Sequence, residues 1–210
     1  MYFRLLQDER SACASYLLAD LEAGEAMLVD PRSADLALLQ AMMAEQRLRL
    51  RWLLRTHNHD SQIPTPELEQ LQMLGAPIIQ GLAHDSRLLP FGGESIEVLA
   101  PPGHTQDCLS FRWRDRVFCG GLLAMDACPY QREPVDPQAL WESVMRRLFR
   151  LADETLLFSA HAHQGQLLTL LYQQRRWHPW FARTSRDEFL TRQASRAEHR
   201  VPIHTQTNQD

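Results

Sequence analysis

The chain has 210 residues, of which 44% are hydrophobic and 23% are charged, and this composition predicts one sizeable globular domain. Its formal net charge of −4 gives no indication of a nucleic-acid partner. No apolar run reaches the roughly 18 residues of a membrane span, and no secretory signal opens the chain, so we expect a cytoplasmic protein without a membrane partner. The cysteines form no CxxC pair, so we expect no disulfide framework.

The first part of the chain predicts a meander of antiparallel strands followed by a helix and a further strand. Short apolar or alternating segments between charged turns predict strands at Tyr2–Leu6, Ser15–Ala19 and Ala26–Val29. Apolar residues at helical spacing predict a helix over Ala34–Arg47. The buried strand predicted at Leu50–Leu54 then runs directly into a histidine-containing loop.

The remaining elements continue the mixture of strands and helices. We expect a helix at Pro66–Leu74 that ends at Gly75, and a helix at Pro137–Leu151 that begins after the N-cap Asp136. Strands are predicted at Pro77–Gln80, Ser95–Leu99, Cys108–Trp113, Arg116–Cys119 and Thr155–Phe158, the third and fourth of these pairing as a hairpin. The chain beyond the last strand is predicted to be helical.

Strand groups interrupted by helices in both halves of the chain predict a layered α/β/β/α sandwich. The sequence contains no internal repeat and no low-complexity segment that would mark a boundary. We therefore expect a single domain over residues 1–204, followed by a disordered tail over residues 205–210.

Histidines follow three of the predicted strands, which is where scaffolds mount functional side chains. They are His57 and His59, His104, and His161 and His163. Two imidazoles in a His-x-His pair can face the same side of an extended segment, and neutral imidazole binds zinc, iron or copper. A single His-x-His pair is more often not a ligand pair, but its repetition after strands favours a metal site. The other histidines have no partner pattern and are predicted to lie on the surface: His84, His178, His199 and His204.

Four segments of the chain resemble the metallo-β-lactamase superfamily. Thr56–Gln62 is similar to its THxHxDH metal loop, and Pro102–Thr105 is similar to its PGHT motif. Phe118–Gly121 lies where the family has FTGD, and Ser159–His161 lies where it has PxH. Within the superfamily the chain most resembles the persulfide dioxygenases and the glyoxalase II thioester hydrolases. The resemblance implies an αββα sandwich of the metallo-β-lactamase type, a small-molecule thiol or glutathione derivative as ligand, and compatibility with a homodimer.

The chain departs from the family pattern at three ligand positions. Ser61 stands in place of an aspartate, and Gln62 stands in place of a histidine. Gly121 replaces the aspartate that bridges two metals in the hydrolases and binds iron in the dioxygenases. Serine and glutamine oxygens are neutral and weak ligands, so the resemblance implies that a second metal site is not retained.

The remaining ligand positions imply at most one zinc or iron ion. His57, His59 and His104 would form one three-histidine site, in which a metal-bound water or oxygen carries the chemistry. His161 is a further candidate ligand. Other candidates for the surrounding pocket are Asp60, Ser61, Gln62, Gly121, Asp126 and Cys128.

Three interpretations follow from this pattern. The first is a mononuclear metalloenzyme with altered activity on a small thiol, persulfide or thioester. The second is a metal-free pseudoenzyme that acts as a binding or regulatory protein. The third, which the residues favour least, is a dinuclear hydrolase in which Asp60 or Asp126 substitutes for the missing ligands.

Overall fold

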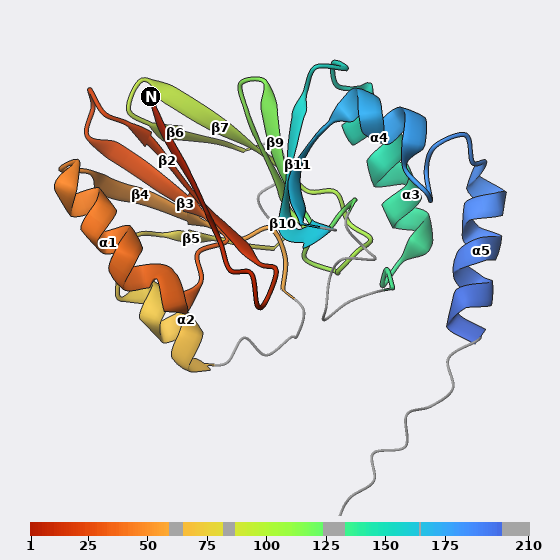
Figure 1. Ribbon diagram of the computed structural model, residues 1–210, viewed down its shortest axis with the longest axis horizontal. Helices are drawn as coiled ribbons and strands as arrows, with labels where there is room; N and C mark the ends of the chain where they lie inside the picture. Colours follow the sequence, from red (N-terminus) through yellow and green to blue (C-terminus); the bar gives the residue numbers. More distant parts are fainter. Residues whose placement is uncertain (59–64, 82–86, 124–132, 164, 199–210) are drawn as a thin grey trace, which may run out of the picture.

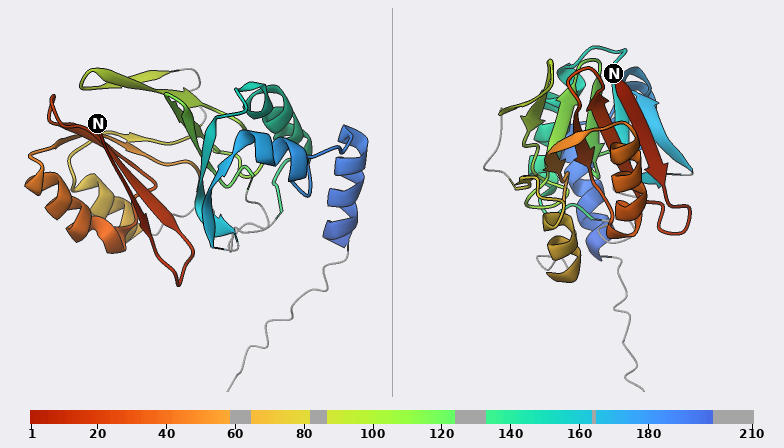
Figure 2. Two further views of the ribbon diagram at one scale, coloured as in Figure 1. Left: turned by 45° about the horizontal axis from the view of Figure 1, so that its top comes forward. Right: turned by 90° about the vertical axis from the view of Figure 1, so that its left-hand side faces the viewer.

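Two β-sheets pack face to face between two layers of helices (Figure 1). The computed structural model describes residues 1–58, 65–81, 87–123, 133–163 and 165–198. Figure 2 shows the two sheets side by side, with helices on their outer faces. The prediction of an αββα sandwich is therefore confirmed.

The first sheet contains five strands in the order β1-β2-β3-β4-β5. The antiparallel meander of the first three is confirmed, and β3, β4 and β5 run parallel to one another. The strands are β1 (Tyr2–Gln7), β2 (Ala14–Asp20), β3 (Glu25–Val29), β4 (Arg49–Leu54) and β5 (Ile78–Ile79).

The second sheet contains six strands in the order β11-β10-β9-β8-β7-β6. All neighbours are antiparallel except β9 and β10, which run parallel. The strands are β6 (Leu88–Phe91), β7 (Glu94–Leu99), β8 (Ser110–Trp113), β9 (Arg116–Gly120), β10 (Leu156–His163) and β11 (Gln166–Leu170). The predicted hairpin of β8 and β9 is confirmed.

The helices cover the outer faces of the sheets because each central strand is apolar on both sides. In β2, Tyr16 and Leu18 face the other sheet, while Leu17 and Ala19 pack under the helices. Helices α1 (Leu36–Glu45) and α2 (Thr65–Gln72) cover the first sheet, and α3 (Pro137–Arg146), α4 (Leu171–Trp177) and α5 (Arg186–Glu198) cover the second. Among the described residues, no helix combines the length and apolar character needed to cross a bilayer.

Several predicted boundaries differ from the structure. The predicted helix Pro137–Leu151 is divided into α3 and a short 3-10 turn at Leu148–Arg150. The strand predicted to end at Phe158 continues to His163, so His161 lies within β10 rather than in a loop. Strands β6 and β11 were not predicted, and β11 lies in a region for which helix was expected.

Candidate functional site

Three of the predicted histidines meet at one end of the sandwich, where both sheets contribute. His57 follows β4 of the first sheet, and His161 lies in β10 of the second. His104 lies in the loop between β7 and β8. Their side chains are buried, with exposed fractions of 7%, 3% and 0% for His57, His161 and His104. The structure thus brings together imidazoles that are up to 104 positions apart in the chain.

The imidazole nitrogens of His57 and His161 lie close together. Their Nε2 atoms lie 3.2 Å apart. Two ligands with Zn–N bonds of about 2.0–2.1 Å in tetrahedral geometry would have their nitrogens about 3.3 Å apart. The ring of His104 is T-shaped against that of His57, with centroids 5.2 Å apart. The His57 and His161 nitrogens therefore fit either a shared proton or one shared cation.

The described residues alone do not form a complete metal centre. No group of three or more His, Cys, Asp or Glu side chains within them is arranged to hold an ion. The remaining histidine of the predicted site, His59, lies outside the described residues, as do the pocket candidates Asp60, Ser61, Gln62, Asp126 and Cys128. The proposed ligand set of His57, His59 and His104 remains a prediction.

A hydrogen-bonded chain from Asp30 through Thr56 orients His57. The Thr56 hydroxyl donates to Asp30 Oδ2 at 2.7 Å, and the Thr56 backbone N–H donates to Asp30 Oδ1 at 2.7 Å. Thr56 Oγ1 also lies 2.7 Å from His57 Nδ1. Because the single hydroxyl proton is directed at Asp30, the oxygen accepts a hydrogen bond from His57 Nδ1–H. This tautomer leaves the lone pair of Nε2 directed toward His161.

The Asp30 carboxyl is buried at the end of β3, in a backbone conformation with φ of 47°. Burial raises the pKa of Asp30 from 3.8 to about 6, while the hydrogen bonds from Thr56 and the charge of Arg55 act in the opposite direction. A carboxyl with this pKa is ionised at neutral pH. The buried charge therefore favours a proton on the side of His57 that faces Thr56.

His161 is held from the opposite sheet by the segment that precedes β2. Cys13 Sγ lies 3.5 Å from His161 Nδ1, and the two residues form an isolated β-bridge. The N–H of Ala162 donates to the Ala12 carbonyl oxygen at 2.7 Å. Burial raises the pKa of the Cys13 thiol, so the group beside His161 is a neutral thiol at physiological pH.

The loop that carries His104 is seated on the start of α3. Backbone N–H groups of Val135 and Asp136 donate to the carbonyl oxygens of His104 and Gly103 at 3.1 and 3.0 Å. Gly103 has φ of +134°, and a Cβ there would lie 2.3 Å from the backbone of Leu140. Glycine is needed at this position because the loop backbone contacts the helix backbone directly.

Two glycines at the end of β9 pack directly against the site. A Cβ on Gly120, which has φ of +58°, would lie 2.6 Å from Thr56 Oγ1. A Cβ on Gly121 would lie 2.3 Å from His104 Cε1. The absence of a carboxylate at residue 121, noted from the sequence, therefore coincides with a position that the His104 ring fills.

Sequence reasoning missed the roles of three residues beside the imidazoles. Thr56 opens the metal-loop motif but was not singled out, although it contacts His57 Nδ1. Cys13, which contacts His161 Nδ1, and Asp30, which accepts from Thr56, were not proposed as site residues. One available signal for Asp30 was its position as a polar residue directly after the apolar strand β3, which lies beside β4 in the sheet. The prediction that His178 lies on the surface is wrong, because it is 6% exposed and its Nε2 lies 2.9 Å from the Leu123 carbonyl oxygen.

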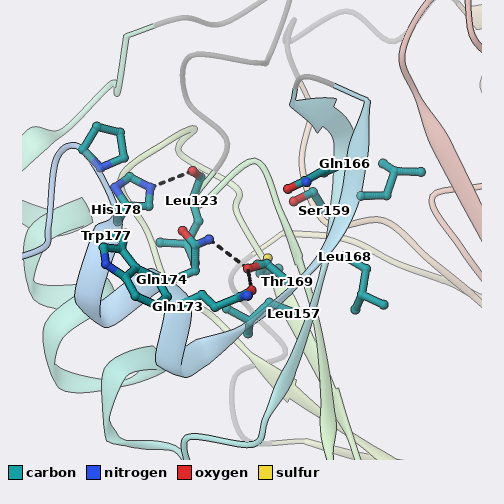
Figure 3. A pocket seen from close by; sticks show the side chains of 13 residues that line it. Leu123, Leu157, Ser159, Gln166, Leu168, Thr169, Gln173, Gln174, Trp177 and His178 are labelled. Carbon is teal, nitrogen blue, oxygen red and sulfur yellow. Dashed lines mark hydrogen bonds between the residues drawn. The ribbon is translucent and has the colours of Figure 1, made fainter.

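A separate cavity of about 300 Å³ lies between β10, β11 and α4 (Figure 3). Its lining includes Ser159, Gln166, Gln174 and Trp177, and none of its lining residues is charged. In Figure 3 the amide of Gln174 donates to the Thr169 hydroxyl across one wall of this cavity. His57, His104 and His161 are not part of its lining, so we do not assign it to the histidine cluster.

A sandwich of two sheets and outer helices, with histidines gathered at one end where strands terminate, is the architecture of the metallo-β-lactamase superfamily. The chain belongs to this superfamily. No family model matches the sequence. The structure is similar to that of ETHE1 from Myxococcus xanthus, with 30% sequence identity, a TM-score of 0.81, and coverage of 92% of this chain and 90% of that chain.

Two curated relatives carry different names. Human mitochondrial persulfide dioxygenase ETHE1 is 28% identical over 183 residues, which are 80% of this chain and 71% of the human protein. A hydroxyacylglutathione hydrolase of Anaeromyxobacter dehalogenans is 32% identical over 149 residues, which are 65% of this chain and 56% of the hydrolase. The resemblance inferred from the sequence motifs is therefore confirmed at the level of the superfamily.

Proposed function

We propose that this chain binds one zinc or iron ion through His57, His59 and His104, with His161 as a further ligand. The proposed substrate is a small thiol, persulfide or thioester, such as a glutathione derivative. The observation that carries the proposal is the 3.2 Å separation of His57 Nε2 and His161 Nε2, which matches two imidazoles on one cation.

The surroundings of the cluster support this proposal. The hydrogen bond to Thr56 places the proton of His57 on Nδ1 and leaves Nε2 as the ligand atom. The names of the relatives, persulfide dioxygenase and hydroxyacylglutathione hydrolase, share a sulfur-containing substrate. With glycine at residue 121, no carboxylate is available from the end of β9, which favours one ion over a bridged pair.

A bound ion would supply Lewis-acid chemistry, polarising a substrate group or activating water or oxygen. The residues of the chain do the rest. Asp30 and Thr56 keep the His57 ring in one orientation and one tautomer. Cys13 contacts the outer nitrogen of His161, and the burial of all three rings excludes bulk water from the cluster. The His57 and His161 nitrogens already lie at a separation that suits one cation, so these two rings need little rearrangement to engage it.

Elemental analysis of protein purified without added metal tests the proposal. We expect about one zinc or iron per chain, and loss of that metal in His104→Ala. His178→Gln is the matched control, because His178 is also buried but lies outside the imidazole cluster. Absence of metal from the wild type, together with stability unchanged by a chelator, would contradict metal binding.

Oxygen consumption with glutathione persulfide then tests the reaction. A rate above that of protein-free buffer, abolished by His104→Ala, is expected for a dioxygenase. A rate equal to that of buffer, with thioester hydrolysis present, would instead indicate a hydrolase.

The second candidate is a metal-free binding or regulatory protein. It is favoured by the same short separation, because His57 and His161 can share a proton in an N–H···N hydrogen bond without a cation. A metal-free wild type that is inactive toward both substrates would support this candidate.

A further inference from the structure

The space above Gly121 is occupied by an imidazole. A Cβ built on Gly121 would lie 2.3 Å from Cε1, 2.5 Å from Nδ1 and 3.1 Å from Nε2 of His104. The first two separations are far below the 3.5–4.0 Å at which carbon atoms pack favourably. Any side chain at this position must therefore displace the ring.

Backbone conformation does not explain the glycine. Gly121 is absent from the positions with positive φ, whereas its neighbour Gly120 has φ of +58°. The φ of Gly121 therefore does not by itself require a glycine. The requirement at this position is therefore one of space.

His104 has little freedom to move aside. Its side chain has an exposed fraction of 0%, its ring packs against His57, and its Nδ1 lies 3.9 Å from Cys108 Sγ. Its carbonyl oxygen accepts the N–H of Val135, and the preceding Gly103 contacts the backbone of α3. A buried ring held on several sides yields to a new side chain only if the surrounding structure shifts.

We infer that Gly121 provides the space in which the His104 ring lies, and thereby determines which side chains can act as ligands at the site. The missing side chain at residue 121 leaves the space that the imidazole fills, so the end of β9 cannot contribute a carboxylate while His104 keeps its place. Restoring an aspartate at residue 121 would therefore dismantle the histidine cluster rather than complete it. The consequence for metal binding rests on the proposed function, whereas the steric coupling between residues 121 and 104 does not.

A double-mutant cycle measured by denaturant unfolding tests the steric coupling. Gly121→Ala should raise the unfolding equilibrium constant at least about tenfold, since it overpacks a buried position. In the His104→Ala background the same substitution should change the constant less than about twofold, because the ring it meets is gone. Equal effects of Gly121→Ala in both backgrounds would overturn the inference.

Gly93→Ala is the matched control for the loss of a glycine. Gly93 also lacks a positive φ, and a Cβ there would meet its nearest atom, Asp20 Oδ2, at an ordinary 3.6 Å. We expect this variant to unfold with a constant close to that of the wild type. If Gly121→Ala were equally neutral, the crowding around His104 would be of no consequence and the inference would be wrong.

The metal content of Gly121→Asp tests the second half of the inference. We expect the bound metal per chain to fall at least about tenfold relative to the wild type, even though a potential ligand has been added. A Gly121→Asp protein that holds as much metal as the wild type, or more, would overturn it. If the wild type itself holds no metal, the proposed function fails, and the unfolding cycle still decides the steric coupling.

Discussion

Asp30 carries a buried charge one hydrogen bond away from the residue that orients His57. Its carboxylate accepts both the hydroxyl and the backbone N–H of Thr56. Burial nevertheless raises its pKa to about 6, so the cost of removing the charge from water outweighs the benefit of these hydrogen bonds. A charge kept at such a cost is consistent with a role in fixing the tautomer of His57.

The raised pKa makes a specific contribution to the pH dependence of stability. Between the unfolded pKa of about 3.9 and the folded pKa of about 6, the folded protein binds more protons at this site than the unfolded chain. The stabilisation is therefore fully present below about pH 4 and is lost as pH rises through 6. A difference of about two units corresponds to about 3 kcal/mol in the free energy of unfolding.

The free energy of unfolding of the wild type and Asp30→Asn, compared between pH 4 and 7, isolates this contribution. As pH rises from 4 to 7, the free energy of unfolding of the wild type should fall by up to about 3 kcal/mol relative to that of Asp30→Asn. Carboxyls with lowered pKa values, such as Asp20 and Glu94, affect both proteins equally and cancel. Parallel pH profiles would show that Asp30 does not titrate in this range.

At the scale of residues, the sequence predicted histidines better than it predicted their partners. His57, His104 and His161 are recognisable because imidazoles after strand ends form a pattern along the chain. Cys13 and Asp30 could not be identified in this way, because their contacts to the cluster depend on the pairing of strands distant in sequence. The absence of a carboxylate at residue 121 was visible, but the presence of the His104 ring in its place depends on tertiary packing.

Among the elements, helix α3 acts on the site through its first turn, which supports the loop of His104. The Asp136 side chain accepts the N–H of Ala139 at 2.9 Å, and Pro137 occupies the first helical turn. Both features were predicted from the sequence and are confirmed. The backbone N–H of Asp136 also donates to the Gly103 carbonyl oxygen. The same residue therefore caps the helix and holds the loop of His104.

Asp136→Ala should lower the free energy of unfolding by about 1 kcal/mol, because it removes the N-cap of α3. Thermal or denaturant unfolding measures the loss. Asp136→Asn retains an oxygen acceptor of similar capping strength and serves as the control, with an expected change of a few tenths of a kcal/mol. If the alanine variant were as stable as the wild type, the cap would not contribute to the folded state.

The elements that sequence reasoning missed lie at the edge of a sheet or at an irregularity. Strand β11 is an edge strand in which Leu168 and Leu170 are exposed, so it lacks the clean alternation of a strand with one buried face. Strand β10 continues past Phe158 through a shift in register with β9 and β11. Alternating patterns end at such irregularities, which explains why His161 was assigned to a loop.

For the whole molecule, binding of a metal ion at the histidine cluster should increase the free energy of unfolding. A ligand that binds only the folded state adds about 2.7 kcal/mol at a concentration 100 times its dissociation constant. For a chain of this size we expect zinc to raise the unfolding midpoint by roughly 5–10 °C and a chelator to reverse the change. Differential scanning calorimetry measures both. A similar response in His104→Ala would place the effect outside the cluster.

The overall architecture was predictable because the hydrophobic pattern reports the layers directly. Strands apolar on both faces, such as β2, require helices outside and a second sheet inside. The family motifs also indicated which loops carry the candidate ligands. Neither source could show how closely the loops approach one another, because distances of 2–4 Å depend on the packing of the two sheets.

The position of the cluster between the two sheets would give a bound ion a topological role. His57 belongs to the first sheet and His161 to the second, and 104 positions of the chain separate them. A cation held by both would act as a reversible cross-link that closes this long loop. Closing a loop of about 100 residues restricts the unfolded chain by an amount worth about 4.7 kcal/mol in the loop-entropy description of a disulfide. In a chain for which we expect no disulfide framework, such an ion would take the place of a disulfide as the cross-link. Acid or a chelator, instead of a reductant, would remove it.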